Sequence, residues 1–390
     1  MHIEIDKSAL VAAMEPALGC VSTRRMTLDR PIPTAGFRFL CRDGVDSIDF
    51  AAYDLEKGYR TICPAIVFEG GSAVLEAARL NQMIRLMPEG RIEIEVDDKG
   101  LVKVTGGSSV FEMSSLPGED FPDMPDLRGE EGYVVKQSQL KEIIGQTIFA
   151  SAVNEPRQAL NGIFFKAVEG EFTAVSCDGN RLALRIDGGE KAAKFDEGGR
   201  KKMFSFIIPI KAVTELQRIL SNDEEKTVRV IQGAKNVVYE LGDDSIFFSR
   251  LIDTEYIDYI RFIPTSFKTE VTVDAKRFLN ALERASLITE ERTAGQVRSA
   301  VKCRFADDIA EIGAVSSTGR VRDEFRVDME GDPIEIAFNC RFLLDAVRAS
   351  DSEKLRLSLI SPIQSMIIED PETEADEKYL FLVLPVKMRS

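Results

Sequence analysis

Three times along the chain, a run of alternating apolar residues is followed by an apolar pattern with helical spacing. Alternation is typical of a half-buried strand, and side chains four apart share one face of a helix. Each copy therefore predicts a strand that leads into an amphipathic helix. The positions are Ile3, Ile5, Leu10, Met14 and Leu18 in the first copy, Tyr133, Val135, Leu140, Ile144 and Ile148 in the second, and Val271, Val273, Phe278 and Leu282 in the third, where Ser286 departs from the pattern.

A second unit, a helical pattern followed by an alternating strand, also occurs once in each copy. The helical patterns cover residues 73–86, 211–220 and 338–347. The alternating strands follow each of them after a break. The sequence thus predicts an α+β fold of three similar domains, each with two helices packed on antiparallel sheet. The predicted domains are residues 1–129, 130–268 and 269–390.

The length of the copies limits what the repetition can mean. Solenoid repeats are about 20 to 50 residues long, much shorter than these domains. Long tandem copies in one chain favour a pseudo-symmetric object, and closed rings are a common use of one.

Composition leaves the class of partner open. The net charge of −15 argues at first against nucleic acid, because Lys and Arg drive phosphate binding. Local charge decides a binding face, however, so the total excludes nothing. No apolar run approaches the roughly 18 to 20 residues of a membrane span, and the N-terminus lacks a signal pattern. We expect a cytoplasmic protein without a membrane partner.

The residues that usually bind metals or act in catalysis are sparse. The one histidine, His2, lies at the N-terminus, where we expect the chain to be mobile, so a zinc enzyme or a histidine triad is disfavoured. The cysteines form no CxxC pair and are expected to be reduced, packed thiols. They are Cys20, Cys41, Cys63, Cys177, Cys303 and Cys340. We therefore expect no metal and no cofactor.

The best enzymatic constellation is a set of three carboxylates, Asp54, Asp178 and Asp258, as the metal ligands of a hydrolase. Each lies beside a turn, where Asp commonly hydrogen-bonds the local backbone. The structural role is favoured over metal ligation. No glycine-rich phosphate loop, nucleophile elbow or HExxH helix is present. A metal-dependent hydrolase is therefore the less favoured alternative.

Several short stretches carry a family resemblance through their common order and spacing. In chain order they are residues 52–56 (AYDLE), 116–122, 160–165 (LNGIFF), 178–183 (DGNRLA), 258–264, 338–345, 368–370 and 384–387 (LPVK). Together they resemble the β sliding clamps of bacterial DNA polymerase III. No single stretch is specific, but the set extends over nearly the whole chain.

The resemblance implies a processivity factor without catalytic activity. Two subunits would associate head to tail, and their six domains would close a ring around duplex DNA. The ring would tether DNA polymerases and other proteins that carry a clamp-binding motif, and a clamp loader would place it on DNA.

A sliding ring must contact phosphates rather than base edges, because base contacts would stall it. Basic residues on the recurring helices would line the hole, and three arginines in loops resemble DNA contacts of the family. Any one of them is more often a solvated surface residue. The predicted DNA-binding residues are Arg24, Arg25, Arg79, Arg85, Lys141, Arg157, Lys211, Arg218, Lys276, Arg277, Arg284, Arg341 and Arg348.

The resemblance implies two further sites. A peptide groove between domains two and three would be apolar with few polar anchors, as suits short linear motifs. Its residues would be Leu160, Cys177, Gly179, Asn180, Arg181, Leu182, Arg261, Phe262, Ile363, Ser365, Leu382, Val383, Leu384, Pro385 and Val386. At the dimer interface, Phe111 of one subunit would meet Leu287 and Ile288 of the other, although a core role is equally open for these residues.

Some positions depart from the family pattern. The family usually has Thr, His and Pro where this chain has Cys177, Asn180 and Ile257. These changes leave a second alternative open, a diverged scaffold that binds peptides but does not encircle DNA.

Overall fold

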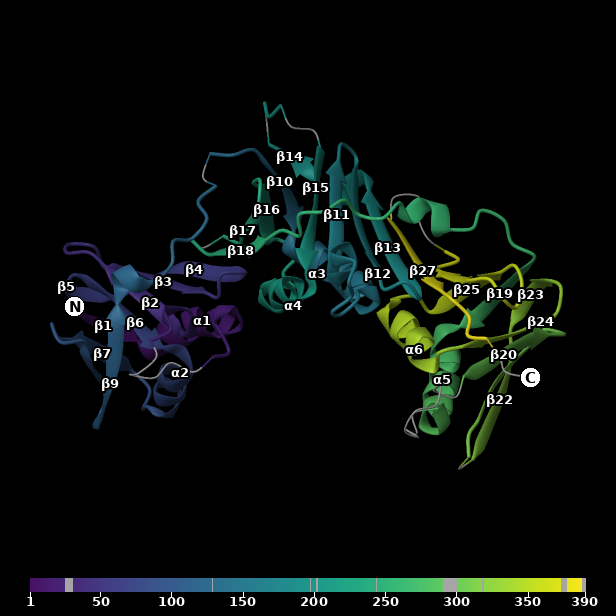
Figure 1. Cartoon of the computed structure of the whole chain (residues 1–390), viewed down its shortest axis with the longest axis horizontal. Helices are drawn as coiled ribbons and strands as arrows, with labels where there is room; N and C mark the ends of the chain where they lie inside the picture. The colour runs from purple at the N-terminus through teal and green to yellow at the C-terminus, as the bar shows by residue number, and fades with distance from the viewer. Residues whose placement is uncertain are drawn as a thin grey trace. The chain divides into compact units, whose positions relative to one another are not determined.

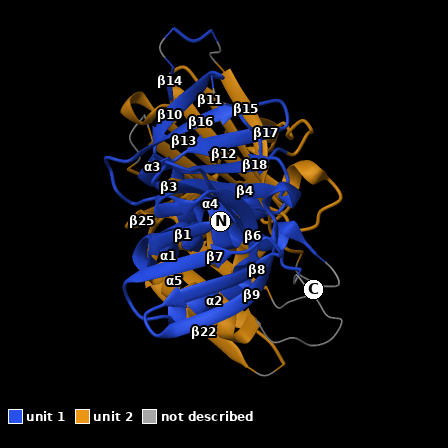
Figure 2. Ribbon diagram, turned by 90° about the vertical axis from the view of Figure 1, so that its left-hand side faces the viewer, with its two compact units in different colours: residues 1–140, 194–201, 211–251 blue, residues 141–193, 202–210, 252–390 orange. Residues whose placement is uncertain are grey.

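The computed structural model describes residues 1–24, 31–127, 129–196, 198–200, 203–242, 244–289, 300–317, 319–372 and 377–387. The chain forms two compact units, coloured separately in Figure 2. Unit 1 comprises residues 1–140, 194–201 and 211–251, and unit 2 comprises residues 141–193, 202–210 and 252–390. The helix α3 (Gln137–Thr147) runs from unit 1 into unit 2, so the division passes through the central copy of the sequence pattern.

Unit 1 is built on one sheet of 14 strands in the order β14-β10-β16-β17-β18-β4-β3-β2-β6-β9-β8-β7-β1-β5. Every pairing in it is antiparallel, as the paired registers show. Its elements are β1 (His2–Asp6), α1 (Lys7–Ala17), β2 (Gly36–Cys41), β3 (Ser47–Tyr53), β4 (Lys57–Pro64), β5 (Ile66–Glu69), β6 (Gly71–Glu76), α2 (Ala77–Leu86), β7 (Arg91–Val96), β8 (Leu101–Gly106), β9 (Ser109–Pro117), β10 (Gly132–Lys136), β14 (Lys194–Phe195), α4 (Ile210–Ile219), β16 (Thr227–Gln232), β17 (Asn236–Glu240) and β18 (Ile246–Arg250).

Unit 2 contains two antiparallel sheets. The larger has nine strands in the order β15-β11-β12-β13-β27-β26-β25-β19-β23, and the smaller has four in the order β22-β21-β20-β24. Its elements are β11 (Gly162–Val168), β12 (Glu171–Cys177), β13 (Arg181–Gly188), β15 (Met203–Pro209), β19 (Thr269–Asp274), α5 (Ala275–Thr289), β20 (Val301–Ala306), β21 (Ile309–Val315), β22 (Arg320–Arg326), β23 (Asp328–Gly331), β24 (Ile334–Phe338), α6 (Cys340–Ala349), β25 (Lys354–Leu359), β26 (Met366–Glu369) and β27 (Glu377–Val383).

The element order confirms the predicted threefold repetition of an α+β domain (Figure 1). Each domain begins with a strand and a helix and ends with a second helix followed by three strands, which are β7–β9, β16–β18 and β25–β27. In this order β4, β13 and β22 occupy equivalent places, and so do β9, β18 and β27. In the third domain α5 and α6 lie side by side against the small sheet, and their apolar faces share its core with Val301, Phe305 and Ile312.

The predicted helices are present, with shifts at their ends. The first four residues of the expected helix 73–86 belong to β6, and α2 begins at Ala77. The last apolar positions of the first two patterns, Leu18 and Ile148, lie in single 3₁₀ turns that follow α1 and α3. Asp6 caps α1, because its side chain accepts a hydrogen bond from the backbone N–H of Ser8.

His2 was expected in a mobile terminus, and this prediction was wrong. It lies in β1, where it pairs with Glu95 of β7, and its main chain is fixed by the sheet on both sides. The alternation of Ile3 and Ile5, which are 0 % and 1 % exposed, anchors the strand to the core. No helix of the described chain is long and apolar enough to cross a membrane.

Strand pairing joins neighbouring domains within each unit. β4 of the first domain pairs with β18 of the second from Arg60↔Ile246 to Lys57↔Ser249. At the equivalent place in unit 2, β13 of the second domain pairs with β27 of the third from Arg181↔Val383 to Asp187↔Glu377. Each junction is thus a continuous sheet, and the second is longer than the first.

Candidate functional site

A four-residue turn presents the DGNR segment at the β13·β27 junction. The N–H of Asp178 bonds the carbonyl of Arg181 across 3.2 Å, and the Asp178 carboxylate accepts from the N–H groups of Asn180 and Arg181. Gly179 has φ +87°, a left-handed conformation that Gly adopts without strain. An equivalent turn follows β3, where the N–H of Asp54 bonds the carbonyl of Lys57.

Arg181 connects this turn to the third domain. Its Nε bonds the Asp178 carboxylate at 3.0 Å, and its Nη1 bonds Asp345 of α6 at 2.6 Å. The guanidinium also lies 4.5 Å from the ring centre of Phe342 and 5.4 Å from that of Phe149. The side chain is only 11 % exposed, so Arg181 holds the turn and α6 together and is not a cation available to a ligand.

An apolar cluster, here called the junction cluster, gathers four of the predicted groove residues. Leu160, Cys177, Leu182 and Leu382 pack together, with Val175, Leu184, Ile367 and Leu380 among their neighbours. The connection between the second and third domains covers part of the cluster with Tyr256, Ile257, Tyr259 and Ile263. Burial raises the pKa of the Cys177 thiol, which keeps it neutral among these side chains.

The remaining predicted groove residues divide into exposed and buried sets. Phe262 and Ile363 are 58 % and 83 % exposed, and Leu384 is 41 % exposed. Tyr259 and Ile263, which flank Phe262 closely in sequence, pack against the junction cluster, so Phe262 stands beside it. Ser365 is buried, and Val383 faces the core of the third domain instead of the cluster, because alternate residues of β27 face opposite ways.

Backbone hydrogen bonds hold the C-terminal segment against both domains. The N–H of Leu384 bonds the carbonyl of Asn180, and the N–H of Val386 bonds the carbonyl of Ala337, each at 2.8 Å. Pro385 lies between them and is half-buried. Arg261 remains at the surface, 83 % exposed, and its ion pair to Asp258 is 2.6 Å long.

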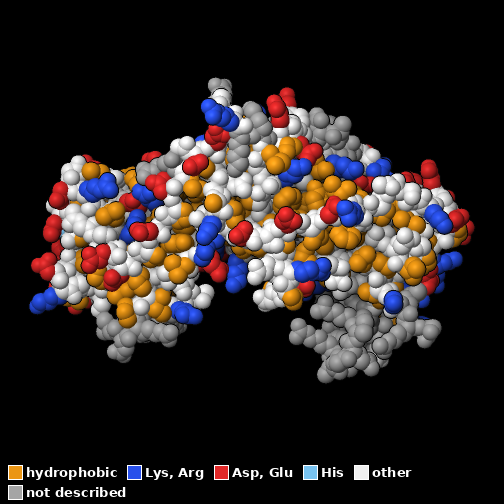
Figure 3. Space-filling view, turned by 45° about the horizontal axis from the view of Figure 1, so that its top comes forward, with side chains coloured by type: hydrophobic (Ala, Val, Ile, Leu, Met, Phe, Trp, Pro, Cys, Tyr) orange, Lys and Arg blue, Asp and Glu red, His pale blue; other side chains and the backbone are white. Residues whose placement is uncertain are grey.

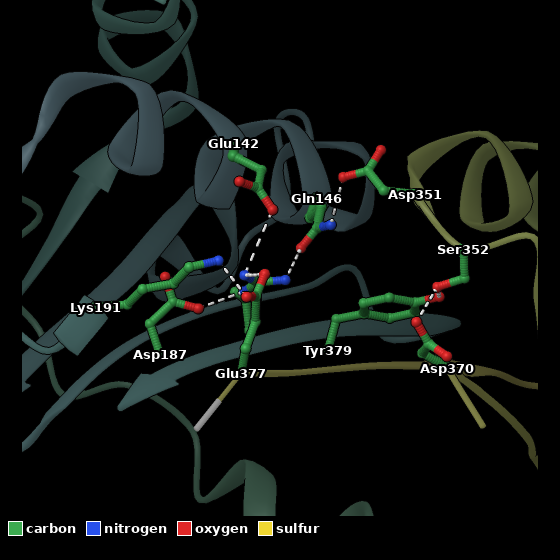
Figure 4. Close-up of polar contacts among 10 residues, drawn as sticks. Glu142, Gln146, Asp187, Lys191, Asp351, Ser352, Asp370, Glu377 and Tyr379 are labelled. Carbon is green, nitrogen blue, oxygen red and sulfur yellow. Dashed lines mark hydrogen bonds and ion pairs between the residues drawn. The ribbon is translucent and has the colours of Figure 1, made fainter. Parts of the chain in front are cut away.

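A buried polar network, which the sequence analysis did not predict, lies at the other end of the same junction (Figure 4). Arg185 is 3 % exposed and bonds Asp187, which is 0 % exposed, at 2.5 Å. The Arg185 guanidinium also bonds Gln146 of α3 and Glu377 of β27. Nearby, Ser352 bonds both Asp370 and the hydroxyl of Tyr379. The network links α3 and β13 of the second domain to β27 of the third.

The first junction repeats the apolar design but differs in charge. Tyr53, Val238 and Phe248 stand where the second junction has Cys177, Ile367 and Leu382, as the strand registers show. Gly58 replaces Leu182, and the ring of Phe248 fills the space, because a Cβ there would lie 2.2 Å from its Cζ.

Over this first junction the residues are charged. In the second junction Phe164 stacks on Tyr256, with ring centres 4.9 Å apart. At the equivalent place in the first junction, Arg38 lies 5.3 Å from the ring centre of Phe121. Arg38 and Arg60 both bond Asp49. A cavity of about 600 Å³ is lined by these charged residues together with Met124, Leu127, Ile231, Val238 and Ile246.

The predicted DNA-binding residues lie on helices and in loops as expected, but they differ in how they are bonded. Arg25 lies outside the described residues. Several of the others are already engaged, which lowers the charge they can offer to phosphate. Arg218 bonds the carbonyls of Glu15 and Pro16 at the end of α1, and Arg284 bonds Asp323 through two contacts. Arg348 pairs with Glu283, Arg157 pairs with Glu155, and Arg341 lies 3.9 Å from Asp345. Arg85 bonds Asn81, and Lys141 is half-buried and engaged in a contact within the chain.

Four helix cations are better placed to meet a ligand. Arg79 on α2, Lys211 on α4, and Lys276 and Arg277 on α5 are exposed, and none has an ion pair within the described chain. Arg24 is exposed in the loop after α1. On the face drawn in Figure 3, by comparison, Lys and Arg side chains are interspersed with Asp and Glu.

The predicted dimer residues lie at sheet edges and on α5. Phe111 is half-buried in β9, Leu287 is 72 % exposed, and Ile288 packs against the core of the third domain. Among the described residues, β9 pairs with β6 only through Ser115, Leu116 and Pro117, so its first half has β8 as its one described partner strand. β22 pairs only with β21 among the described strands.

The three aspartates of the hydrolase alternative each act locally. Asp54 bonds the N–H groups of Glu56 and Lys57 and the ammonium of Lys57, and Asp178 bonds Arg181 as described. Asp258 pairs with Arg261. Asp54 is in unit 1 and the other two are in unit 2, and each is explained by the turn beside it.

Comparison with known proteins decides the family. Sequence models of the DNA polymerase III beta subunit match the chain with their N-terminal domain at residues 1–125, their central domain at 134–258 and their C-terminal domain at 260–386. The chain belongs to the DNA polymerase III beta subunit family. This family, the β sliding clamps, consists of processivity factors for DNA replication, and the chain is accordingly not an enzyme.

Individual relatives agree with the family over the full length. The chain is 30% identical over 396 residues to the beta sliding clamp of Halalkalibacterium halodurans and 29% identical over 396 residues to that of Bacillus subtilis, in each case across 99% of this chain and 100% of the relative. The crystal structure of the sliding clamp from Bacillus subtilis superimposes with a TM-score of 0.89 at 28% identity, covering 100% of both chains. A putative beta subunit from Eubacterium rectale, at 24% identity, shares the fold with the same TM-score and full coverage of both chains.

Two features of this family member escaped the sequence analysis. One is the network around Arg185, for which the signal was a pair of charges, Arg185 and Asp187, alternating with apolar residues in an otherwise buried strand. The other is two exposed apolar residues, Val153 in a loop and Ile260 in the 3₁₀ turn Tyr259–Phe262, which are 74 % and 68 % exposed and whose sequence neighbours Ala152 and Tyr259 pack in the junction cluster. Nothing in their local sequence separates them from ordinary loop residues.

Proposed function

We propose that the protein is a DNA sliding clamp that encircles duplex DNA as a head-to-tail homodimer and tethers DNA polymerases for processive synthesis. The observation that carries the proposal is the pattern of sheet edges. At both internal junctions, a strand of the β4 and β13 type pairs with a strand of the β18 and β27 type. In the part of the chain that the structure describes, the strands left without such a partner are β22 in the third domain and the first half of β9 in the first.

An unpaired edge is a template for another strand. If β22 of one subunit pairs with β9 of the next, the contact repeats the two internal junctions, and the same contact on the other side closes a ring of two subunits. Phe111 lies in that half of β9, and Leu287 with Ile288 lies on the helix that packs on the β22 sheet. The proposed domain boundaries are those of the sequence analysis, 1–129, 130–268 and 269–390.

DNA would be contacted by the helices in a sequence-independent way. Arg79, Lys211, Lys276 and Arg277 would supply most of the phosphate contacts, with Arg24 from the loop after α1. The residues already bonded within the chain would contribute less, because a phosphate contact would cost them an existing partner. Long residence on DNA would come from topology, so these contacts can be weak and sensitive to salt.

Peptide segments of polymerases and of the clamp loader would dock at the junction cluster. The exposed apolar side chains Phe262, Ile363 and Leu384 would bury their surface against the partner, while Arg181 and the Arg185 network keep the two domains in register. The cluster suits an extended segment with apolar anchors. Backbone groups of the C-terminal segment are already bonded to both domains, so apolar side chains would make most of the contacts with the partner. The protein would act in the cytoplasm.

Retention on DNA circles tests the proposal. The purified protein is loaded onto nicked circular duplex with its cognate loader and ATP, and the fraction bound is measured before and after the circle is cut. Retention on circles and rapid loss after cutting is the expected result. Equal retention before and after cutting would mean ordinary electrostatic binding and would overturn the ring, and failure to bind either form with an active loader would point to the peptide-binding scaffold.

A further inference from the structure

The single histidine of the chain faces two carboxylates across a strand pair in unit 1. His2 of β1 lies directly opposite Glu95 of β7, and Glu93 is two residues from Glu95 on the same face. The Nε2 atom of His2 is 2.7 Å from Oε1 of Glu93 and 3.7 Å from Oε1 of Glu95. The three ligand atoms lie within 4.8 Å of one another.

The main chain under these side chains is rigid. Ile3 and Ile5 of β1 alternate with the polar face and are buried, as are Ile92 and Ile94 of β7, so all four fix both strands to the core. Residues i and i+2 of one strand and the residue opposite them converge on one face of a sheet. The His2 ring is further held by the ring of Phe68, whose centre is 4.6 Å away. The main chain that carries the three ligands is therefore fixed before any ion binds.

The local charges favour a cation. Glu4 stands directly opposite Glu93, and like charges in that relation destabilise a strand pair. Arg91 bonds Glu4 and Lys103 lies 3.5 Å from Glu95, whereas Glu93 has His2 as its only polar partner within the described chain. A divalent ion between Glu93 and Glu95 would neutralise Glu93, which none of these basic residues contacts, and would share Glu95 with Lys103.

We propose that His2, Glu93 and Glu95 form a binding site for a divalent transition-metal ion, with Zn²⁺ as the best fit. Zn²⁺ takes imidazole nitrogen and carboxylate oxygen at about 2.0 to 2.2 Å, which separates tetrahedral ligands by about 3.3 Å. The observed distances of 2.7 and 3.7 Å lie on either side of that value, so small side-chain rotations suffice. Mg²⁺ is a poor fit because it prefers six oxygen ligands.

The ion would tie the first strand of the chain to β7. Three protein ligands leave a fourth position for water, and the exposed fractions of the side chains, 30 %, 38 % and 42 %, leave that position open to solvent. A metal ion binds the lone pair of an imidazole nitrogen, so Nε2 of His2 would exchange its contact with Glu93 for a bond to the ion. This inference is independent of the ring and would hold for the isolated subunit as well as for the dimer.

The test uses the full-length chain with any affinity tag removed, so that His2 remains the only imidazole. Calorimetric titration with ZnCl₂ is performed on the wild type, His2→Gln and Glu95→Gln, and on Glu112→Gln as the control. Glu112 is an exposed carboxylate on the neighbouring strand pair, opposite Lys103. One ion per chain is expected for the wild type and the control, with at least tenfold weaker binding for the other two variants.

A second readout separates the site from adventitious binding. The single imidazole gives one set of ring signals in a ¹⁵N-labelled sample, and Zn²⁺ but not Mg²⁺ should shift them with the same saturation as the heat signal. The cysteines are all buried and do not compete in the folded protein. Equal Zn²⁺ affinity for the wild type and His2→Gln, or imidazole signals that stay unchanged at saturation, would overturn the site.

Discussion

Arg185 and Asp187, two residues apart on β13, face the same side of the strand and form an ion pair with an Nε–Oδ1 distance of 2.5 Å. Their side chains are 3 % and 0 % exposed. Burial lowers the pKa of the Arg185 guanidinium less than Asp187 and Glu377 raise it, so the net shift is upward and the guanidinium stays charged. A charge pair buried so fully depends on both of its members.

Replacement of Arg185 by alanine should therefore destabilise the protein strongly. The substitution removes the guanidinium that the buried Asp187 faces, and breaking a buried pair in this way costs about 3 to 5 kcal/mol. Urea unfolding followed by circular dichroism measures the change. The control is Arg261→Ala, whose pair with Asp258 is 83 % and 55 % exposed and should be worth less than about 1 kcal/mol. Equal losses for the two variants would contradict the structural role of the network.

The Arg185–Asp187 pair shows which structural features a local sequence pattern predicts and which it does not. Alternation in the segment from Leu182 to Asp187 predicts a strand, because its period is local. The partners that make burial of Arg185 tolerable, Gln146 and Glu377, are 39 and 192 residues away. No local pattern predicts pairings over that separation, so the domain repeat could be inferred while the junctions between domains could not.

Four of the predicted groove residues lie together in the structure. Leu160, Cys177, Leu182 and Leu382 were inferred together from the family resemblance, and they pack in one cluster. The predicted DNA contacts on the helices were chosen by residue type and helix position. Such a choice cannot detect that Arg284 and Arg218 are bonded to groups elsewhere in the chain.

Alkaline pH should weaken the fold through its buried thiols. Burial raises the pKa of Cys20 to about 12 from its usual 9.0, so the unfolded chain releases this proton first. The stability linked to Cys20 is present below pH 9 and is lost as the pH rises toward 12, by about 1.4 kcal/mol at pH 10. Free energies of unfolding at pH 8 and pH 10 measure the loss. Cys20→Ala should show a smaller difference between the two pH values, and an unchanged difference would contradict the assignment to this thiol.

An acidic residue at position 287 should weaken the proposed dimer. Leu287 is 72 % exposed on α5, so Leu287→Asp leaves the subunit folded while it places a charge in the apolar contact with Phe111. Sedimentation equilibrium should show a dissociation constant raised at least tenfold. The matched control is Ile363→Asp, at an 83 % exposed position away from the proposed interface, which should sediment as the wild type does. An unchanged constant for Leu287→Asp would exclude α5 from the interface.

Loss of an unbonded cation should affect DNA binding more than loss of a bonded one. Arg277 is exposed and has no ion pair in the described chain, whereas Arg284, two helical turns along α5, makes two contacts to Asp323. Arg277→Ala should lower the salt dependence of binding to duplex DNA by about one phosphate contact, a slope of about 0.9. Fluorescence anisotropy at several salt concentrations gives the slope. Arg284→Ala should leave it nearly unchanged, and the reverse order would contradict the distinction between the two arginines.

Truncation of Phe262 should weaken peptide binding at the junction cluster. The ring is 58 % exposed and would be buried by an apolar anchor of the partner, so Phe262→Ala should reduce affinity about tenfold or more. The probe is a fluorescein-labelled peptide that carries the clamp-binding motif of the cognate polymerase, followed by anisotropy. Ile260→Ala, at a 68 % exposed position on the same 3₁₀ turn, is the matched comparison and should have less than a threefold effect. Similar losses for both would place the peptide over the turn as a whole.

Because the strand ladder between β13 and β27 is continuous, an intact peptide chain is not needed to hold the second domain to the third. Seven residue pairs, a shared apolar cluster and the Arg185 network all join the second domain to the third, while the connecting segment from Ile252 to Lys268 has no strand. If the chain were cut within that segment, β13 in one piece could still pair with β27 in the other. Split into two polypeptides, the protein should reassemble from its pieces as readily as two different subunits recognise each other.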